Sequence, residues 1–454
     1  MAPPKPAYPS LPGNHYLPGS DQDATPVGLL WTHSLVWGLL CMDALSFLGI
    51  PYRLISATDI CQGRLEAERL RTLIVPGGWA DHKVRALGER GRSEIAGFID
   101  AGGSYIGFCG GAGLALSSPP ALNLVPIRRM DISRRLPSAS GRVYVHGMQA
   151  HAVWKDIPQQ VPVSIWWPSQ FLMPSGCEAR CLASYTDRTG DDFQVADIKV
   201  SGIEGSTNWG ELEKLYGINL DPAKLQGQPA IIEARRGKGR LILSYAHLET
   251  PEDIWGNRLF FNILQYLDDS CADPGRLTAA SRGPAAVLLS GAGQRANVRL
   301  PLSRVVKARQ AAGELIAFGE ANRLWNWRKP WLLYWRRGVR GFECGSLFVT
   351  LCCLAELEAK SGSVAGSAEL EHMTLEFCGL ARQLLFEEKI AAEKGALSKI
   401  GKVNDKIDSL RALLFGAKMN HGGLCSQLFE HIDRMLLDSF NSMEDARGEI
   451  AGAI

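Results

Sequence analysis

The stretch from Tyr105 to Leu116, YIGFCGGAGLAL, constrains the fold of this chain more than any other segment. An apolar, strand-like run leads into Cys109, which is followed by glycines and then by small apolar residues typical of the start of a helix. A nucleophile in a sharp strand-to-helix turn needs neighbours with almost no side chain, and Gly107 and Gly111 meet that need. The pattern predicts a nucleophile elbow with cysteine in the nucleophile position.

Two other strand-like segments end in residues that suit the same site. The first, LIVPGGW, ends in two glycines whose turn exposes backbone N–H groups, so Gly78 and Gly110 are candidates for an oxyanion hole. The second, GRLILSYAHLE, ends in His247 and Glu249, which strand alternation puts on one side. A carboxylate beside a histidine can orient the imidazole for proton transfer, which makes these two candidate partners of Cys109.

These segments resemble the class I glutamine amidotransferase-like superfamily, which carries a Cys-His-Glu triad. Within it, the chain is most similar to the domain found at the N-terminus of eukaryotic biotin–protein ligases and in stand-alone bacterial proteins. The matching pieces are VPGGWAD, ALGERGRSEIAGFIDAGGSYIGFCGGAGLAL and GKGRLILSYAHLETPED, in this order, over roughly residues 27 to 270. The resemblance implies Cys109 as nucleophile, His247 as base and Glu249 as its partner. Leu248 departs from it, because amidotransferases commonly have proline there.

Strand-like and helical runs alternate in the first part of the chain. Val27 to Thr32 and Tyr52 to Ile55 have strand character, Leu35 to Leu48 lies between them as a helix, and a helix from Arg92 to Ala101 precedes the strand that carries the cysteine. The alternation predicts an α/β fold with a doubly wound parallel sheet, flavodoxin-like as the resemblance implies. Ligands of such sheets bind at the carboxyl ends of the strands.

The segment from Arg142 to Gly205 is richer in turns and β-type runs. We expect this insertion to build one wall of the substrate pocket, with Trp166, Trp167 and Gln170 as candidate lining residues. Indole rings are also common in cores, so we expect packing to be the role of at least one of the two tryptophans.

Composition divides the chain into four parts. Residues 1–26 are proline-rich and predict a disordered tail, and residues 27–272 form the amidotransferase-like domain. Residues 273–300 have the composition of a linker. Residues 301–454 show helical periodicity with few strand signals, which predicts an α-helical domain of unknown function.

The helical part contains one unusual segment, residues 323–337, which interleaves tryptophans with basic residues. A tryptophan-rich core with basic ends at its edge is one interpretation, and a protein-binding surface is the second. A membrane interface or stacking on nucleic acid is the third, although we expect no nucleic-acid partner because the net charge is only +2.

The overall composition fits a cytoplasmic globular protein. The chain has 454 residues, 46% of them apolar, which is enough for two or three domains with their own cores. Its 11 cysteines are irregularly spaced, which argues against a disulfide framework, and Cys177 and Cys181 lack the further pair that a zinc site needs. No apolar run is long enough for a transmembrane segment, and we expect neither a metal nor a cofactor.

Two classes of function remain open. The first is a cysteine-dependent hydrolase or amidotransferase-like enzyme that acts on a C–N amide-type bond of a small molecule. The sequence contains no phosphate-binding loop of the Gly-x-x-x-x-Gly-Lys-Ser/Thr type and no biotinyl-adenylate motif, so neither a synthetase of that type nor a ligase is expected. The alternative is a non-catalytic binding or scaffold protein on the same fold, whose helical domain mediates protein interaction.

Overall fold

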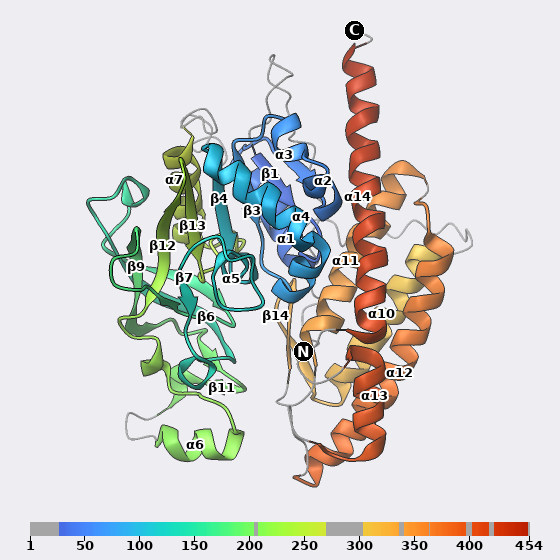
Figure 1. Cartoon of the computed structure of the whole chain (residues 1–454). Helices are drawn as coiled ribbons and strands as arrows, with labels where there is room; N and C mark the ends of the chain where they lie inside the picture. Colours follow the sequence, from blue (N-terminus) through green and yellow to red (C-terminus); the bar gives the residue numbers. More distant parts are fainter. Residues whose placement is uncertain are drawn as a thin grey trace. The chain divides into compact units, whose positions relative to one another are not determined.

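The computed structural model describes residues 27–203, 208–268, 303–335, 340–362, 364–395, 402–416 and 422–452. They belong to two compact units, an α/β unit up to residue 268 and a helical unit from residue 303 (Figure 1). The predicted tail, 1–26, and the predicted linker, 273–300, lie outside the described residues. Among the described helices, none is long and apolar enough to cross a membrane.

One half of the α/β unit's main sheet is parallel. Its strands are β1 (Val27–Leu30), β2 (Arg53–Ile55), β3 (Thr72–Val75), β4 (Ser104–Phe108) and β13 (Gly239–Ser244). They lie in the order β2-β1-β3-β4-β13, and each neighbouring pair is parallel. The carboxyl ends of β3, β4 and β13 therefore meet at one edge, with β4 in the middle.

Helices connect the parallel strands, as the alternating pattern predicts. They are α1 (Leu35–Phe47), α2 (Ala57–Cys61), α3 (Arg64–Ala67), α4 (Ala80–Ala101) and α5 (Gly110–Ala115), with α7 (Ile254–Leu267) after β13. The predicted helix from Arg92 to Ala101 is the second part of α4, which is broken at Gly88 by a backbone φ of 55°. The predicted doubly wound sheet followed by a mainly helical region is thus confirmed.

The second half of the sheet is antiparallel, which makes the whole sheet mixed. After β13 come β12 (Pro229–Arg236), β9 (Ala179–Thr189) and β6 (Ala139–Gly147), and β6 also pairs with β7 (Gln160–Trp166). The shorter elements are β10 (Gln194–Val195), β11 (Ile198–Lys199), α6 (Trp209–Tyr216) and a separate ribbon of β5 (Arg128–Arg129) with β8 (Phe171–Leu172). The predicted insertion therefore extends the sheet itself.

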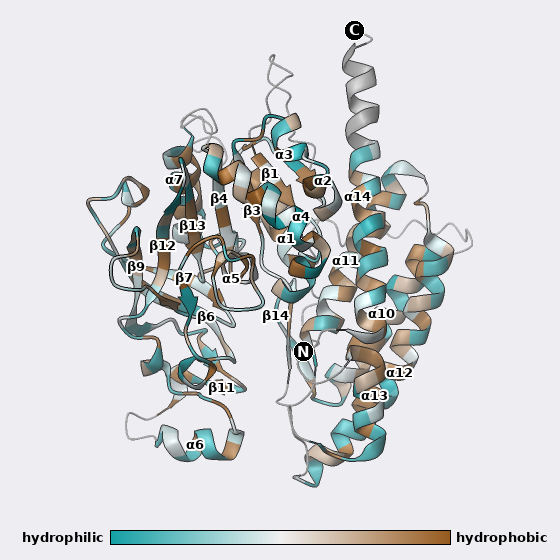
Figure 2. Ribbon diagram, viewed as in Figure 1, coloured by the Kyte–Doolittle hydropathy of each residue, from teal (hydrophilic) through white to brown (hydrophobic). Residues whose placement is uncertain are grey.

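The core of the α/β unit consists of fully buried strand and helix residues. Figure 2 shows mainly hydrophobic colours on the central strands, and Val75, Tyr105 and Leu243 from three of them lie in one cluster. Leu114 and Ala115 of α5 belong to the same cluster. Burial of this kind contributes about 25 cal/mol per Å² of apolar surface, so the segment after Cys109 is held by the core of the unit.

The helical unit contains five helices and one β-hairpin among its described residues. The helices are α10 (Arg304–Ala321), α11 (Phe342–Ser361), α12 (Ser367–Glu393), α13 (Asp405–Phe415) and α14 (Gly423–Gly452). The hairpin, β14 (Trp325–Lys329) with β15 (Leu332–Trp335), falls in the tryptophan-rich segment, so the predicted α-helical region is interrupted there by two short strands. Aromatic residues favour strands, and this segment contains four tryptophans and a tyrosine.

One tryptophan of the hairpin, Trp325, packs inside the helical unit. Trp325 is 3% exposed and Trp331 is 5% exposed, and Trp325 packs so closely on Gly319 that a Cβ there would lie 2.2 Å from the ring. Trp325 thus follows the first of the three interpretations, a packed core.

Candidate active site

Cys109 stands between the end of β4 and the start of α5 in a strained conformation. Its backbone φ is 47° and its ψ is −103°, a region that residues with a side chain avoid. The Cys109 N–H donates to the carbonyl of Ser244 at the end of β13, 2.8 Å away. This bond ties the strained residue to the neighbouring parallel strand, and the surrounding structure fixes a conformation that the residue alone would not adopt.

Close passage of strand and helix explains the glycines around the cysteine. A Cβ on Gly107 would lie 2.7 Å from the carbonyl oxygen of Gly111, and a Cβ on Gly111 would lie 1.9 Å from that of Val75. Real Cβ atoms do not approach backbone so closely. Both positions therefore require glycine, and together they aim the partly exposed Cys109 out of the buried strand.

Gly78 and Gly110 bring two loops together beside the cysteine. A Cβ on Gly110 would lie 2.1 Å from the carbonyl oxygen of Gly78, and Gly78 itself has a φ of 100°. Gly110 is the first residue of α5, so its N–H has no partner within the helix. The two glycines that the sequence nominated for an oxyanion hole are thus neighbours next to Cys109.

His247 and Glu249 form a short hydrogen bond in the loop after β13. The Nδ1 atom of His247 and the Oε1 atom of Glu249 are 2.6 Å apart, and both side chains are fully buried. A carboxylate on Nδ1 fixes the imidazole so that Nε2 is the atom available for proton transfer. In the described residues, Nε2 has no hydrogen-bond partner of good geometry.

The charges at this site favour a protonated imidazole. Burial lowers the pKa of His247, but the interactions of the imidazole with Glu249 and Cys109 outweigh it and raise this pKa to about 10. A carboxylate next to a buried imidazole stabilises the protonated ring. The histidine is therefore set to donate a proton as well as to accept one.

The loop that carries His247 is anchored on both sides. The His247 N–H donates to the carbonyl of Ser164 in β7, and the side-chain amide of Asn257 in α7 donates to the carbonyls of Leu248 and Thr250. Leu248, where the resembling family has proline, is fully buried. The loop lacks the proline that would restrict its backbone, and hydrogen bonds from β7 and α7 hold it in place instead.

Trp37 and Lys83 support the site, and sequence reasoning did not single out either of them. The Trp37 ring lies 4.4 Å from the His247 ring, centroid to centroid. The ammonium of Lys83, which is fully buried, donates to the carbonyls of His33 and Gly77 and to the Ser34 hydroxyl at 2.7 to 3.1 Å. A lysine on an amphipathic helix normally faces solvent, so the sequence alone could not show that Lys83 is buried and supports the site.

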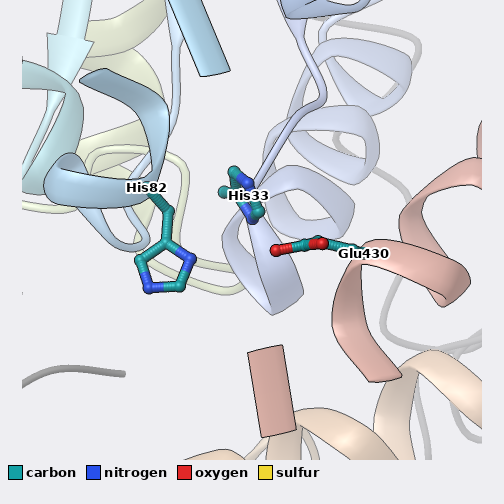
Figure 3. A group of neighbouring side chains, drawn as sticks. All are labelled: His33, His82 and Glu430. Carbon is teal, nitrogen blue, oxygen red and sulfur yellow. The ribbon is translucent and has the colours of Figure 1, made fainter. Parts of the chain in front are cut away.

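His33 and His82 lie next to this lysine, with ring centroids 4.9 Å apart (Figure 3). Burial, followed by the positive charge of Lys83, lowers the pKa of His33 to about 3, so this imidazole is neutral. Two imidazoles supply too few ligands for a zinc site, which takes four. Glu430, the third residue drawn there, belongs to the helical unit and is not counted with the pair.

The three predicted pocket-wall residues have different surroundings. Trp166 is 1% exposed, and its indole N–H donates to the hydroxyl of Thr250, although its carbonyl lies 3.9 Å from the Cys109 sulfur. Trp167 is half-buried and packs edge-to-face on Trp37. Gln170 is fully buried, and its amide donates to the carbonyl of Lys224 at 3.0 Å. Trp166 and Gln170 have packing partners of their own, which leaves Trp167 as the more accessible of the three.

Comparison with known proteins agrees with the predicted resemblance over part of the chain. Residues 63–118 match the family described as biotin-protein ligase, N terminal, a range that includes Gly78 and Cys109 but not His247. No curated protein matches the chain.

Several solved structures share similarity at low identity. A protein from Thermoplasma acidophilum, assigned as one of the subunits of a GMP synthase, is 13% identical, with 54% of this chain and 94% of that chain covered and a TM-score of 0.34. A glutamine amidotransferase from Thermotoga maritima is 13% identical, with 58% and 94% covered and a TM-score of 0.31. A β-galactosidase from Bacillus circulans is 12% identical, with a TM-score of 0.33, and the match covers 54% of this chain and 31% of the enzyme.

Proposed function

We propose that the α/β unit is a cysteine-dependent hydrolase or amidotransferase that cleaves a C–N amide-type bond with Cys109, His247 and Glu249. The observation that carries the proposal is the strained conformation of Cys109, with φ 47°, beside a fully buried histidine that is hydrogen-bonded to a buried carboxylate. Strain of this kind is kept where the surrounding structure enforces it, and it is typical of nucleophile elbows.

The chemistry follows from the atoms present. The Cys109 thiolate attacks the amide carbonyl carbon, and the backbone N–H groups of Gly78 and Gly110 stabilise the oxyanion that forms. The C–N bond then breaks as the imidazolium of His247 gives its Nε2 proton to the leaving amine, which leaves a thioester on the sulfur. A water molecule attacks the thioester, neutral His247 takes a proton from that water, and the thiolate leaves from the carboxylic acid product.

Glu249 keeps the imidazole in place through these steps. Its carboxylate accepts a hydrogen bond from the Nδ1–H group in both protonation states of the ring, so that only Nε2 gains and loses a proton. The partly exposed Cys109 receives the substrate, while the side chains of His247 and Glu249 are fully buried.

The test is release of amine or ammonia from a panel of primary and secondary amides by the full chain. We expect activity that Cys109→Ala abolishes and that Cys177→Ala leaves unchanged, since Cys177 is another partly exposed free thiol. Selective alkylation of Cys109 at pH 7, dependent on His247, is the second readout. If Cys109 reacts no faster than Cys177 and no amide is cleaved, the fold is a non-catalytic scaffold.

A further inference from the structure

Two arginines near Cys109 take no part in the chemistry described above. Arg129 lies in β5, where it pairs with Phe171 of β8. Its guanidinium rests on α5, because a Cβ on Gly113 would lie 2.2 Å from Nη2 of Arg129. The Gly113 N–H in turn donates to the carbonyl of Cys109 at 2.9 Å. The charged head group of Arg129 therefore lies within one helical turn of the nucleophile.

Arg135 brings a second positive charge to the same place. Burial lowers the pKa of Arg135, and the positive charge of Arg129 lowers it further. Both Nε atoms are buried without a hydrogen-bond partner among the described residues. Asp131 forms its ion pair with exposed Arg128, at 3.9 Å. Asp131 offsets only part of the cost of these two like charges, because its carboxylate also pairs with Arg128, and an anion between the two half-buried guanidinium groups would lower the rest.

Two hydroxyl groups complete this cluster. The buried hydroxyls of Tyr245 and Ser169 lie next to each other, and the Tyr245 hydroxyl also lies next to the guanidinium of Arg129. Burial raises the pKa of Tyr245, the positive charge of Arg129 and hydrogen bonds with Arg129 and Ser169 lower it, and the interaction with Cys109 raises it. Tyr245 is thus close to Arg129 and Cys109, and it lies two residues before His247.

We infer that Arg129, Arg135 and the Tyr245 hydroxyl bind an anionic group, a carboxylate or a phosphate, on the substrate that Cys109 attacks. Guanidinium groups bind such oxygens through two parallel N–H donors, and the hydroxyl adds a third donor. The inference rests on the proposed function and narrows it to amides that carry an anionic group near the scissile bond.

Anion binding can be tested without the nucleophile. In the full-length Cys109→Ala protein, the rise in melting temperature is measured with glutarate, with its neutral diamide glutaramide, and with inorganic phosphate. We expect saturable stabilisation by glutarate, by phosphate or by both, and none by glutaramide. The stronger of the two anions identifies carboxylate or phosphate as the natural group. Arg129→Met and Arg135→Met should each weaken binding about tenfold, as loss of a charge-assisted hydrogen bond does.

The matched control is Arg128→Met, which removes an equal charge from an exposed neighbour. Gly113→Ala is a second, gentler variant, since the added methyl meets only the flexible tip of Arg129 and displaces it. It should weaken anion binding while the fold is retained. Equal stabilisation by glutaramide, no stabilisation by either anion, or unchanged binding in the Arg129 and Arg135 variants would overturn the inference.

Alkylation of the wild-type chain separates this inference from the proposed function. Iodoacetate and iodoacetamide react by the same displacement, but only iodoacetate is an anion. We expect the ratio of their rates at Cys109, read by peptide mass spectrometry, to exceed the ratio at Cys177 and to fall about tenfold in Arg129→Met. If Cys109 reacts fast with iodoacetamide but shows no preference for iodoacetate, the anion site is contradicted and the proposed enzyme is not. If the Cys109→Ala protein binds the anion but Cys109 of the wild type is unreactive, the proposed enzyme is contradicted and the anion site is not.

Discussion

The imidazole of His247 packs on the indole of Trp37, with ring centroids 4.4 Å apart and ring planes at 34°. Trp37 comes from α1, and it is 3% exposed. Its ring covers one face of the imidazole, while Glu249 holds the edge at Nδ1. The histidine is therefore fixed in two directions, by Glu249 two residues along the chain and by Trp37 from a distant helix.

Trp37→Leu should loosen the imidazole without removing any group that exchanges a proton. We expect the rate of Cys109 alkylation at pH 7 to fall about tenfold, because small displacements of a catalytic group cost about this much or more. Trp37→Phe, which keeps an aromatic face, should lose less. Trp209→Leu, in α6, controls for loss of a partly buried indole elsewhere. Equal rates in the Trp37 and Trp209 variants would show that the contact does not position His247.

Stability should depend on pH through His247. Its pKa in the folded chain, about 10, lies above the ordinary value of 6.5. The charged imidazole therefore contributes stability in full below about pH 6.5, and this contribution is lost as the pH rises through about 10. The free energy of urea unfolding should fall between pH 6.5 and 10 in the wild type and fall less in His247→Asn. His146→Asn, at an exposed histidine, should follow the wild type, and parallel curves for all three proteins would refute the assignment.

The parallel half of the sheet could be predicted because its signals are local. Short apolar runs alternate with helical segments, and glycines mark the turn at Cys109. Contact between His247 and Glu249 could also be anticipated, since they are two residues apart. The β-hairpin at Trp325 could not, because the ring packs on Gly319, and that neighbour is set by tertiary structure.

The residues that support the site could not be predicted from the sequence either. Lysine and arginine usually lie on solvated surfaces, and nothing near Lys83 or Arg129 in the sequence indicates burial or a partner. Their roles depend on which segments the fold brings together. The loop at Gly77 reaches Lys83 only because the helix α4 folds back after β3, and Arg129 reaches α5 only through the ribbon of β5 with β8.

Lys83→Met should damage the loop that carries Gly77 and Gly78. The ammonium donates three hydrogen bonds in a fully buried place, and methionine leaves the carbonyls of His33 and Gly77 without their donor. Unsatisfied buried groups cost about 1 to 3 kcal/mol each, so we expect a loss of a few kcal/mol in unfolding free energy. Amide cleavage at a temperature where the variant is folded should also fall. Lys155→Met, at an exposed lysine, is the control, and a loss of stability with unchanged activity would limit Lys83 to folding.

Cys109→Gly should be more stable than Cys109→Ala, although both remove the nucleophile. With φ 47° and ψ −103°, alanine keeps the steric strain of the cysteine, whereas glycine adopts this conformation freely. Relief of about 1 to 3 kcal/mol is partly offset by the greater chain entropy of unfolded glycine, about 0.4 to 1 kcal/mol, which leaves a net gain of about 1 kcal/mol. Urea unfolding of the two variants measures the difference directly. The control is the same pair of substitutions at Cys177, which has no positive φ, where glycine should be no more stable than alanine. If Cys109→Gly is the less stable variant, residue 109 is not strained, and the elbow that supports the proposed nucleophile loses its physical basis.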